Sequence, residues 1–469
     1  MRYQAAYLDW LNILGNTKCF IIPYICRTFL KQNTMRFSIK TFAAAFLVFA
    51  ALSTQAQNRT DGYYKDIFMD SGIKLTSRVD LPAARFLGLQ MEKFVSVETK
   101  ADLGTQTTYL DTLLQNNLMV GNPVDENGCL LYPDGAPRYK VLYVNGGRAA
   151  SHGKTLGEDG RERVRKFVKM GGSYVGTCAG MFVASLGTHG FVDTLPPKLY
   201  EGYFGVWPSL TVGSGLSRTP TGMFIEPGSP LLNYYDFGGD MYIDSVYHNG
   251  GGFTMPQDME RTPGAEVLLR YDYEKKRMHK QISAWAWKEN ALTGRVVLCG
   301  SHPEGVTSGE RLHLFSAFLK YAMDGNGAPA LKAELKMGEA RRMDRCTHDM
   351  MPSYTRIGDR QYHHFTVNVP EGTDTLRISL KPVLGYDNYD LHLFADSEGL
   401  AFVKNAKYKN VKNGIDKVLT VVRPKAGTLY VSVFCDTTVD TVVSPVYGTQ
   451  YTGRLDVLNG VPYVIEVQY

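Results

Sequence analysis

The chain has 469 residues, of which 51 are lysine or arginine and 46 are aspartate or glutamate, and its formal net charge is +5. Six of the basic residues and one of the acidic residues precede Gln57, so the rest of the chain carries 45 of each sign. This balance removes charge as a reason to expect a nucleic-acid partner. The roughly 410 residues from Gln57 onward are enough for two domains with sizeable cores.

Residues 35–56 have the three parts of a secretory signal peptide. The segment begins with basic residues, continues with an apolar core over residues 41–52 and ends in small residues before Gln57. The core is too short to span a bilayer, which takes about 20 residues, and the cleavage site is not followed by a cysteine for a lipid anchor. We therefore expect a secreted or periplasmic protein with no stable membrane anchor after cleavage. We interpret residues 1–34 as a gene-start error.

From Gln57 onward the sequence predicts alternating strands and helices. The expected strands are at 66–69, 139–144, 173–175 and 295–299, and the expected helices are at 81–94, 159–170 and 310–323. The helix at 159–170 is amphipathic, because its apolar residues recur at helical spacing opposite lysines and arginines. Residues 187–280 are rich in glycine, proline and aromatic residues. They predict an irregular insertion of strands and loops that shapes a pocket.

A cysteine between two glycines follows the strand at 173–175, in the sequence Gly176-Thr177-Cys178-Ala179-Gly180. Such glycines let a strand turn sharply into a helix, because a side chain at either position would crowd the turn. The turn would expose the Cys178 sulfur at the helix N-terminus, which favours the nucleophilic thiolate. The pattern therefore indicates a cysteine nucleophile. The alternative is a buried cysteine beside glycines that serve helix–strand packing.

A second motif supplies a base for this thiol. The buried strand at 295–299 runs into His302-Pro303-Glu304. Residues two apart in an extended segment point the same way, so His302 can take the thiol proton while Glu304 orients the imidazole. His248 is a rival base, but no carboxylate lies two residues away from it.

The cysteine turn and the His-Pro-Glu strand resemble class I glutamine amidotransferases, over about residues 62–325. The pattern Gly-Gly-x-Tyr-x-Gly-x-Cys-Ala-Gly at 171–180 and the segment Asn249-Gly250-Gly251 are closer to the amidotransferase-like N-terminal domain of biotin–protein ligases. The resemblance implies a flavodoxin-like, doubly wound parallel sheet, with substrate bound at Asn249, Gly250 and Gly251. The Gly-Arg-Gly-Arg-x-Gly signature of the ligase catalytic domain does not occur in the sequence. The likeness therefore implies the fold and the nucleophile rather than the overall reaction of those families.

The same resemblance locates an oxyanion hole. The strand at 139–144 runs into the glycine loop Asn145-Gly146-Gly147-Arg148, and the corresponding loop of the amidotransferases supplies backbone N–H groups to the oxyanion. This implies that the amides of Gly147 and Ala179 bind the oxyanion. The alternative is a plain strand-to-helix turn.

Residues 340–469 have a different sequence pattern from the preceding part of the chain. Short β-rich runs alternate with turns, which is typical of an antiparallel sandwich. The runs at 389–393 and 462–464 resemble the pre-peptidase C-terminal domain that is appended to secreted hydrolases. The predicted organisation is an amidotransferase-like α/β domain at 57–325, a linker at 326–339 and an independently folded β-sandwich domain at 340–469.

Cysteine and histidine usage adds two expectations. Five cysteines follow Gln57, an odd number that suits one free thiol, and spacing does not show whether Cys346 and Cys435 pair. His363-His364 is a tempting metal pair, but adjacent residues of a strand face opposite ways. We therefore expect neither a metal site nor a cofactor.

Two functions fit these features. The first is an exported cysteine hydrolase that cleaves an amide bond in a peptide, glutamine-like or cell-envelope substrate, with Cys178, His302 and Glu304 as catalytic residues. The second is a non-catalytic module that keeps the fold and binds a ligand. In either case the sandwich is suited to binding protein or glycan.

Overall fold

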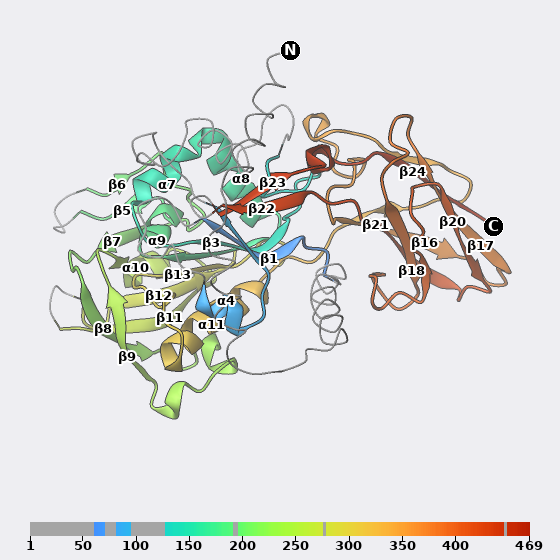
Figure 1. Ribbon diagram of the computed structural model, residues 1–469. Coiled ribbons are helices and arrows are strands. Elements are labelled where there is room, and N and C mark those ends of the chain that lie inside the picture. Colours follow the sequence, from blue (N-terminus) through green and yellow to red (C-terminus); the bar gives the residue numbers. More distant parts are fainter. Residues whose placement is uncertain (1–60, 71–80, 95–126, 191–195, 275–277, 445–447) are drawn as a thin grey trace, which may run out of the picture. The chain divides into compact units, whose positions relative to one another are not determined.

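The structure is a computed structural model that describes residues 61–70, 81–94, 127–190, 196–274, 278–444 and 448–469 (Figure 1). The predicted signal peptide and the residues before it lie outside the described residues. The described residues all belong to one compact unit. No helix among them is long and apolar enough to cross a membrane.

A nine-stranded sheet forms the core of the N-terminal part. Its strands, in spatial order, are β2 (Met91–Phe94), β1 (Lys65–Asp70), β3 (Tyr139–Val144), β4 (Ser173–Thr177), β13 (Val296–Cys299), β12 (Ile282–Trp287), β11 (Ala265–Asp272), β8 (Thr219–Ile225) and β9 (Tyr242–His248). The first five are parallel and follow the 2-1-3-4-5 order of flavodoxin-like folds. The last four join antiparallel. The predicted fold class is confirmed, and part of the predicted insertion extends the sheet.

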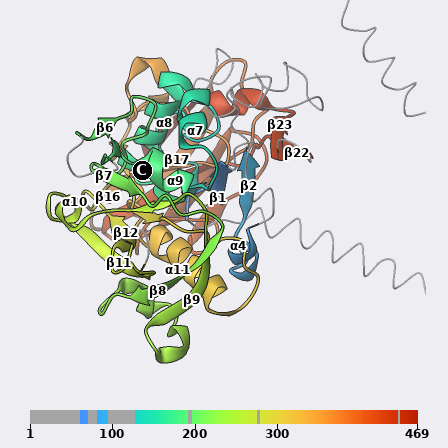
Figure 2. The same cartoon turned by 90° about the vertical axis from the view of Figure 1, so that its left-hand side faces the viewer.

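Helices cover both faces of this sheet (Figures 1 and 2). On one face lie α7 (Ala149–Thr155), α8 (Gly157–Lys169) and α9 (Ala179–Ala184), and on the other lie α4 (Pro82–Phe86) and α11 (Gly309–Met323). The alternation of side chains along β3 produces the two faces. Leu142 packs in the same cluster as Val164 of α8, whereas Tyr143 packs in the same cluster as Phe315 of α11. A strand that is buried on both sides in this way is typical of doubly wound folds.

The helix predicted at 81–94 is wrong in its second half. The helix ends at Phe86, and the chain then forms strand β2. Gly88 has a φ of +66°, in the left-handed region that ends helices. The helix therefore stops there although the following residues are also apolar.

The remaining elements of the α/β part lie in the predicted insertion. A small sheet contains β10 (Gly252–Phe253), β7 (Leu210–Gly213), β5 (Gly187–Thr188) and β6 (Lys198–Leu199). The insertion also contains the helices η3 (Pro230–Asn233), η4 (Phe237–Gly239) and α10 (Pro256–Glu260).

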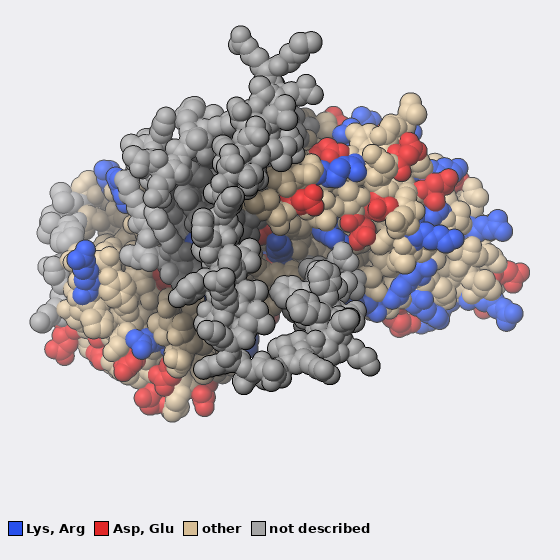
Figure 3. Space-filling model, viewed as in Figure 1, with Lys and Arg blue, Asp and Glu red and all other residues tan. Residues whose placement is uncertain are grey.

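The C-terminal part contains two main sheets of mostly antiparallel strands. One sheet comprises β14 (Leu331–Glu334), β16 (Tyr362–Val369), β21 (Gly427–Cys435), β18 (Leu391–Asp396) and β19 (Tyr408–Asn410), and the other comprises β15 (Arg341–Met343), β24 (Tyr463–Gln468), β17 (Thr375–Pro382) and β20 (Lys417–Val422), with 3-10 helices η5 (Thr347–Asp349) and η6 (Leu455–Asn459) between strands. Strand β14 lies inside the range predicted as linker, and it pairs with β16. The division into domains remains a prediction. On the face seen in Figure 3, basic and acidic side chains are interspersed over this part.

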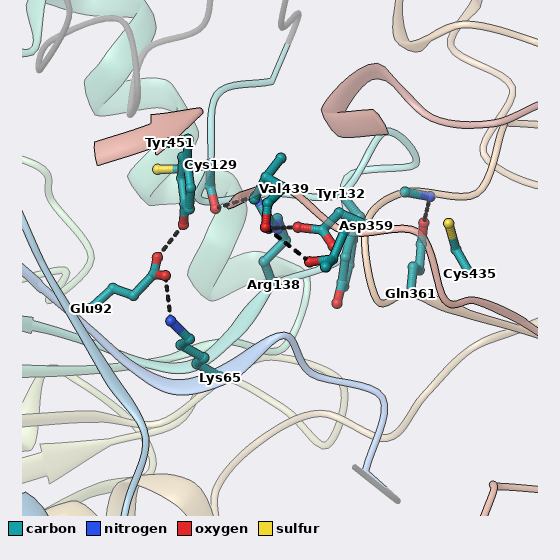
Figure 4. Close-up of polar contacts among 12 residues, drawn as sticks. Lys65, Glu92, Cys129, Tyr132, Arg138, Asp359, Gln361, Cys435, Val439 and Tyr451 are labelled. Carbon is teal, nitrogen blue, oxygen red and sulfur yellow. Dashed lines mark hydrogen bonds and ion pairs between the residues drawn. The ribbon is translucent and has the colours of Figure 1, made fainter. Parts of the chain in front are cut away.

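Buried polar contacts connect the two parts (Figure 4). Arg138, just before β3, donates to Asp359 at 2.7 Å, and neither side chain is more than 1% exposed. The hairpin of β22 (Asp440–Ser444) and β23 (Gly448–Thr452) carries Tyr451, which donates to Glu92 of β2. Glu92 also pairs with Lys65 at 2.5 Å.

Candidate active site

Cys178 occupies the sharp turn between β4 and α9. Its φ of 49° is in the left-handed region, which is rare for residues other than glycine and often marks functional sites. The flanking residues must be glycines, because a side chain at either position would collide with backbone atoms. A Cβ at Gly176 would lie 2.6 Å from the carbonyl oxygen of Gly180, and one at Gly180 would lie 1.8 Å from the carbonyl oxygen of Val144. The predicted turn is therefore present at Cys178, for the predicted steric reason. The predicted exposure of its sulfur is wrong, because Cys178 is only 5% exposed.

The three predicted catalytic side chains meet at the carboxyl ends of neighbouring parallel strands. His302 and Glu304 follow β13, which pairs with β4, and His302 Nδ1 lies 2.8 Å from Glu304 Oε1. The side chains of Cys178 and His302 are close enough to interact, and this interaction helps to raise the pKa of His302. Because Nδ1 is engaged by Glu304, Nε2 is the nitrogen available to the thiol. The order Cys–His–Glu is that of a nucleophile, a base and an orienting group.

Electrostatics favour a charged His302. The three side chains are buried, with relative exposures of 5%, 8% and 3% for Cys178, His302 and Glu304. Burial by itself lowers the pKa of His302, but the charge of Glu304, the hydrogen bond with Glu304 and the interaction with Cys178 outweigh it and raise the pKa to about 11. An imidazolium here can stabilise a thiolate and later protonate a leaving group.

Gly146 makes room for this histidine, a role that the sequence motifs did not show. A Cβ at Gly146 would lie 2.2 Å from His302 Cε1, so the imidazole ring packs directly against the glycine. We expect Gly146→Ala to displace the ring and to slow iodoacetamide labelling of Cys178 by about tenfold or more, since base catalysis depends on hydrogen-bond geometry. Gly305→Ala is the matched control, because open space surrounds Gly305. Equal labelling of the two variants would contradict this role.

The predicted oxyanion loop lies beside the turn. Ala179 is the first residue of α9, where amide N–H groups have no partner within the helix. The carbonyl oxygen of Asn145 accepts a hydrogen bond from the Gly180 amide at 3.1 Å, which ties the loop containing Gly147 to the helix start. The structure thus brings Gly147 and Ala179 to the same sheet edge as Cys178. Their role as oxyanion donors remains a prediction.

The predicted substrate segment also reaches the thiol. Cys178 Sγ donates to the backbone carbonyl oxygen of Asn249 at 3.4 Å. The next glycine, Gly250, has a φ of +73°. A Cβ at Gly251 would lie 1.7 Å from the carbonyl oxygen of Gly300. The segment Asn249–Gly251 therefore packs tightly against the end of β13.

His248, the rival base, is fully buried in a separate network. Its Nε2 lies 2.7 Å from Ser214 Oγ, and its Nδ1 lies 2.9 Å from Ser301 Oγ. Burial and the charge of His302 lower its pKa to about 4, so the ring is neutral near pH 7. Both ring nitrogens are engaged, which makes His248 unsuitable as the base. The two serines were not identified from the sequence, because no local motif marks them.

The described cysteines are all free, so Cys346 and Cys435 do not pair. Burial raises the pKa of Cys299 to about 12 and raises that of Cys435 well above its usual range. Cys346 is half-buried and is the most accessible of the five.

The adjacent histidines of β16 bind different partners. His363 Nδ1 lies 2.9 Å from the Tyr463 hydroxyl, and His364 Nδ1 lies 2.7 Å from Ser432 Oγ. Within the described ranges, no three His, Cys, Asp or Glu side chains form a group that could hold a metal ion.

Comparisons with known proteins give one sequence match and several distant structural ones. No curated protein matches the chain. Among solved structures, the chain is similar to a glutamine amidotransferase (18% identity, TM-score 0.29, covering 50% of this chain and 89% of that one). It is also similar to a protein from Thermoplasma acidophilum that is described as a GMP synthase subunit (11% identity, TM-score 0.33, covering 57% and 96%). A third is the pre-peptidase C-terminal domain of a collagenase from Bacillus anthracis (15% identity, TM-score 0.17, covering 30% and 100%).

The sequence match falls on the part of the chain that contains the cysteine turn. A model of the family described as "Biotin-protein ligase, N terminal" matches residues 98–190, and the structures named above are of the two kinds that the sequence resembles. Over residues 98–190, the resemblance to the N-terminal domain of biotin–protein ligases is confirmed.

Proposed function

We propose that the protein is an exported, cysteine-dependent hydrolase that cleaves an amide bond in a peptide, a glutamine-like compound or a cell-envelope substrate. The observation that carries this proposal is the buried constellation of Cys178, His302 and Glu304, with the cysteine at a strained turn. Desolvated, pre-oriented groups of this kind are typical of nucleophilic catalysis.

The reaction uses only these side chains and water. His302 holds the Cys178 proton as an imidazolium, and the thiolate sulfur bonds to the carbonyl carbon. His302 then gives that proton to the amide nitrogen, the C–N bond breaks, and the amine leaves a thioester on Cys178. Water adds to the thioester as His302 takes its proton. The C–S bond breaks, and the proton returns to the sulfur as the acid is released. Gly147 and Ala179 would stabilise both oxyanions.

Competitive labelling of the native protein tests this function. Accessibility alone makes Cys346 the fastest cysteine, because Cys178 is only 5% exposed. Activation by His302 makes Cys178 the fastest. We expect mass spectrometry after limiting iodoacetamide to find Cys178 modified first, and Cys178→Ser to abolish hydrolysis of amide substrates. Modification of Cys346 first, with Cys178 no faster than in denatured protein, would contradict the proposal.

One observation favours the alternative, a non-catalytic binding module. The Asn249 carbonyl already accepts a hydrogen bond from the thiol, and little of Cys178 is exposed. If Cys178 does not label, this alternative replaces the hydrolase.

The proposal also includes where the protein acts and what it binds. The signal at 35–56 directs export, and the ligand of the α/β part is a small molecule or peptide rather than a nucleic acid. The sandwich binds protein or glycan near the substrate.

A further inference from the structure

The carbonyl oxygen of Asn249 lies next to the reacting sulfur. In the structure its donor is the thiol of Cys178, at 3.4 Å. When the thiol proton passes to His302, this carbonyl loses its hydrogen-bond donor. A half-buried acceptor without a donor is costly, so the site then favours a substrate that brings a donor of its own.

The carbonyl is held in place by its neighbours. The Gly250 amide donates to the Leu216 carbonyl oxygen at 2.7 Å, and the Ser214 amide donates to the Gly251 carbonyl oxygen at 2.9 Å. The His302 amide donates to the Tyr247 carbonyl oxygen at 2.7 Å, which fixes the base to the same segment. The acceptor and the base are therefore presented together beside Sγ.

His248 connects the pieces that frame this carbonyl. Its ring bridges Ser214 Oγ at 2.7 Å and Ser301 Oγ at 2.9 Å. Ser301 directly precedes His302, and His248 directly precedes Asn249. The Tyr271 hydroxyl, 3.3 Å from His248 Nδ1, donates to the Gly252 carbonyl oxygen at 2.9 Å. One buried imidazole thus sets the positions of both sides of the site.

We propose that the Asn249 carbonyl accepts a hydrogen bond from the N–H of the scissile amide, and that His248 is the positioning residue that holds this carbonyl in place. The site then selects primary and secondary amides over esters and tertiary amides. An ester would place its oxygen, which is an acceptor, next to the Asn249 carbonyl oxygen, which is also an acceptor. A tertiary amide has no N–H and would leave the Asn249 carbonyl without a donor. While His302 protonates the amide nitrogen, the Asn249 carbonyl accepts a hydrogen bond from the hydrogen that this nitrogen already carries. This inference rests on the proposed function.

Two alkylating probes isolate the N–H group. Iodoacetamide carries two N–H donors, whereas N,N-dimethyl-iodoacetamide carries none. Each rate at Cys178 is divided by the rate of the same probe with glutathione, so that intrinsic reactivity cancels. We expect wild-type protein to prefer iodoacetamide by about tenfold, the value of one hydrogen bond at the upper end of the usual range.

The variants assign the preference to His248. Ser214→Ala and His248→Ala should bring the ratio of the two rates toward one, and His248→Gln should restore part of it, because an amide can bond both serines. Ser432→Ala is the matched control. It removes a serine–histidine hydrogen bond of the same 2.7 Å length in the sandwich and should leave the ratio unchanged.

The outcomes separate this inference from the proposed function. If wild-type Cys178 reacts rapidly with both probes at a ratio near one, the inference is overturned and the hydrolase remains. A tenfold ratio that survives in Ser214→Ala and His248→Ala would overturn the role of His248. If Cys178 reacts with neither probe faster than denatured protein does, the hydrolase itself is overturned.

Discussion

Replacing His302 with alanine should slow the iodoacetamide labelling of Cys178 by about a hundredfold or more at pH 7, in line with the usual contribution of a positioned base. The imidazole interacts with Cys178, and Glu304 holds it at 2.8 Å. Glu304→Gln should give a smaller loss of the same sign, because Glu304 orients the ring without carrying the transferred proton. Cys178→Ser identifies the labelled site.

The pH dependence of labelling gives a second readout of the same variant. The His302 pKa, raised from 6.5 to about 11, keeps the imidazolium charged through neutral and mildly alkaline pH. The advantage of the wild-type protein over His302→Ala in labelling rate should therefore be largest near neutral pH and should shrink as the pH rises toward 11, where the imidazolium loses its proton. Parallel profiles for the two proteins would show that His302 does not activate Cys178.

The sign for stability follows from the same shift. The pKa of His302 is higher in the folded protein than in the unfolded chain, so its pairing contributes in full below about pH 6.5. That contribution is lost progressively as the pH rises toward 11.

Replacing Arg138 with leucine should lower the free energy of unfolding by about 3–5 kcal/mol, the usual result of breaking a buried ion pair. The Arg138 guanidinium is 2.7 Å from Asp359, and its carbon Cζ lies 4.4 Å from the centre of the Tyr64 ring. Burial raises the pKa of Asp359, and the charge of Arg138 opposes this rise. Without Arg138, the Asp359 carboxylate therefore stays buried and loses its ion-pair partner. Urea denaturation measures the change.

Three further variants make this experiment more specific: Asp359→Leu, the double variant and an exposed-pair control. The double variant Arg138→Leu/Asp359→Leu should recover most of the loss, since two apolar residues leave no unpaired charge. Lys425→Ala breaks the exposed pair with Glu398, whose side chains are 70% and 76% exposed, and should change stability by less than about 1 kcal/mol. A double variant no more stable than either single one would show that the ion pair is not the cause.

Asp359→Leu also tests whether the two parts unfold together. All four tryptophans precede the predicted linker, at positions 10, 207, 285 and 287. Tryptophan fluorescence therefore reports the α/β part, whereas circular dichroism reports both parts. A coupled fold predicts that Asp359→Leu lowers the midpoint of the fluorescence transition. An unchanged midpoint with two separate transitions would support the independent folding predicted from the sequence.

The site was predictable where its chemistry is carried by local spacing. Gly176, Cys178 and Gly180 meet within one turn, and His302 and Glu304 are two residues apart on an extended segment, so their geometry follows from the backbone. The contact of Asn249 with the thiol was not predictable at atomic level, because the atom concerned is a backbone carbonyl.

The features that could not be predicted from the sequence depend mainly on contacts between distant segments. Ser214, His248 and Ser301 come from three parts of the chain, and no pattern of residue types indicates that they meet. The same is true of Arg138 and Asp359, which are 221 residues apart. The shortened helix near Gly88 shows a local limit, since apolar residues continue past the point where the backbone turns left-handed.

If the protein is exported as proposed, its free cysteines affect how the chain must fold. Three of the five described thiols, those of Cys129, Cys299 and Cys435, are buried in the native state and lie outside the proposed triad, so folding shields them from oxidants and other thiols. In the unfolded chain all are exposed, and both five and the seven of the full sequence are odd numbers, so complete internal pairing always leaves one sulfur over. Oxidation before burial would trap scrambled disulfides and covalent dimers. In an oxidising compartment, the yield of native protein would therefore depend on whether the core forms faster than the thiols are oxidised.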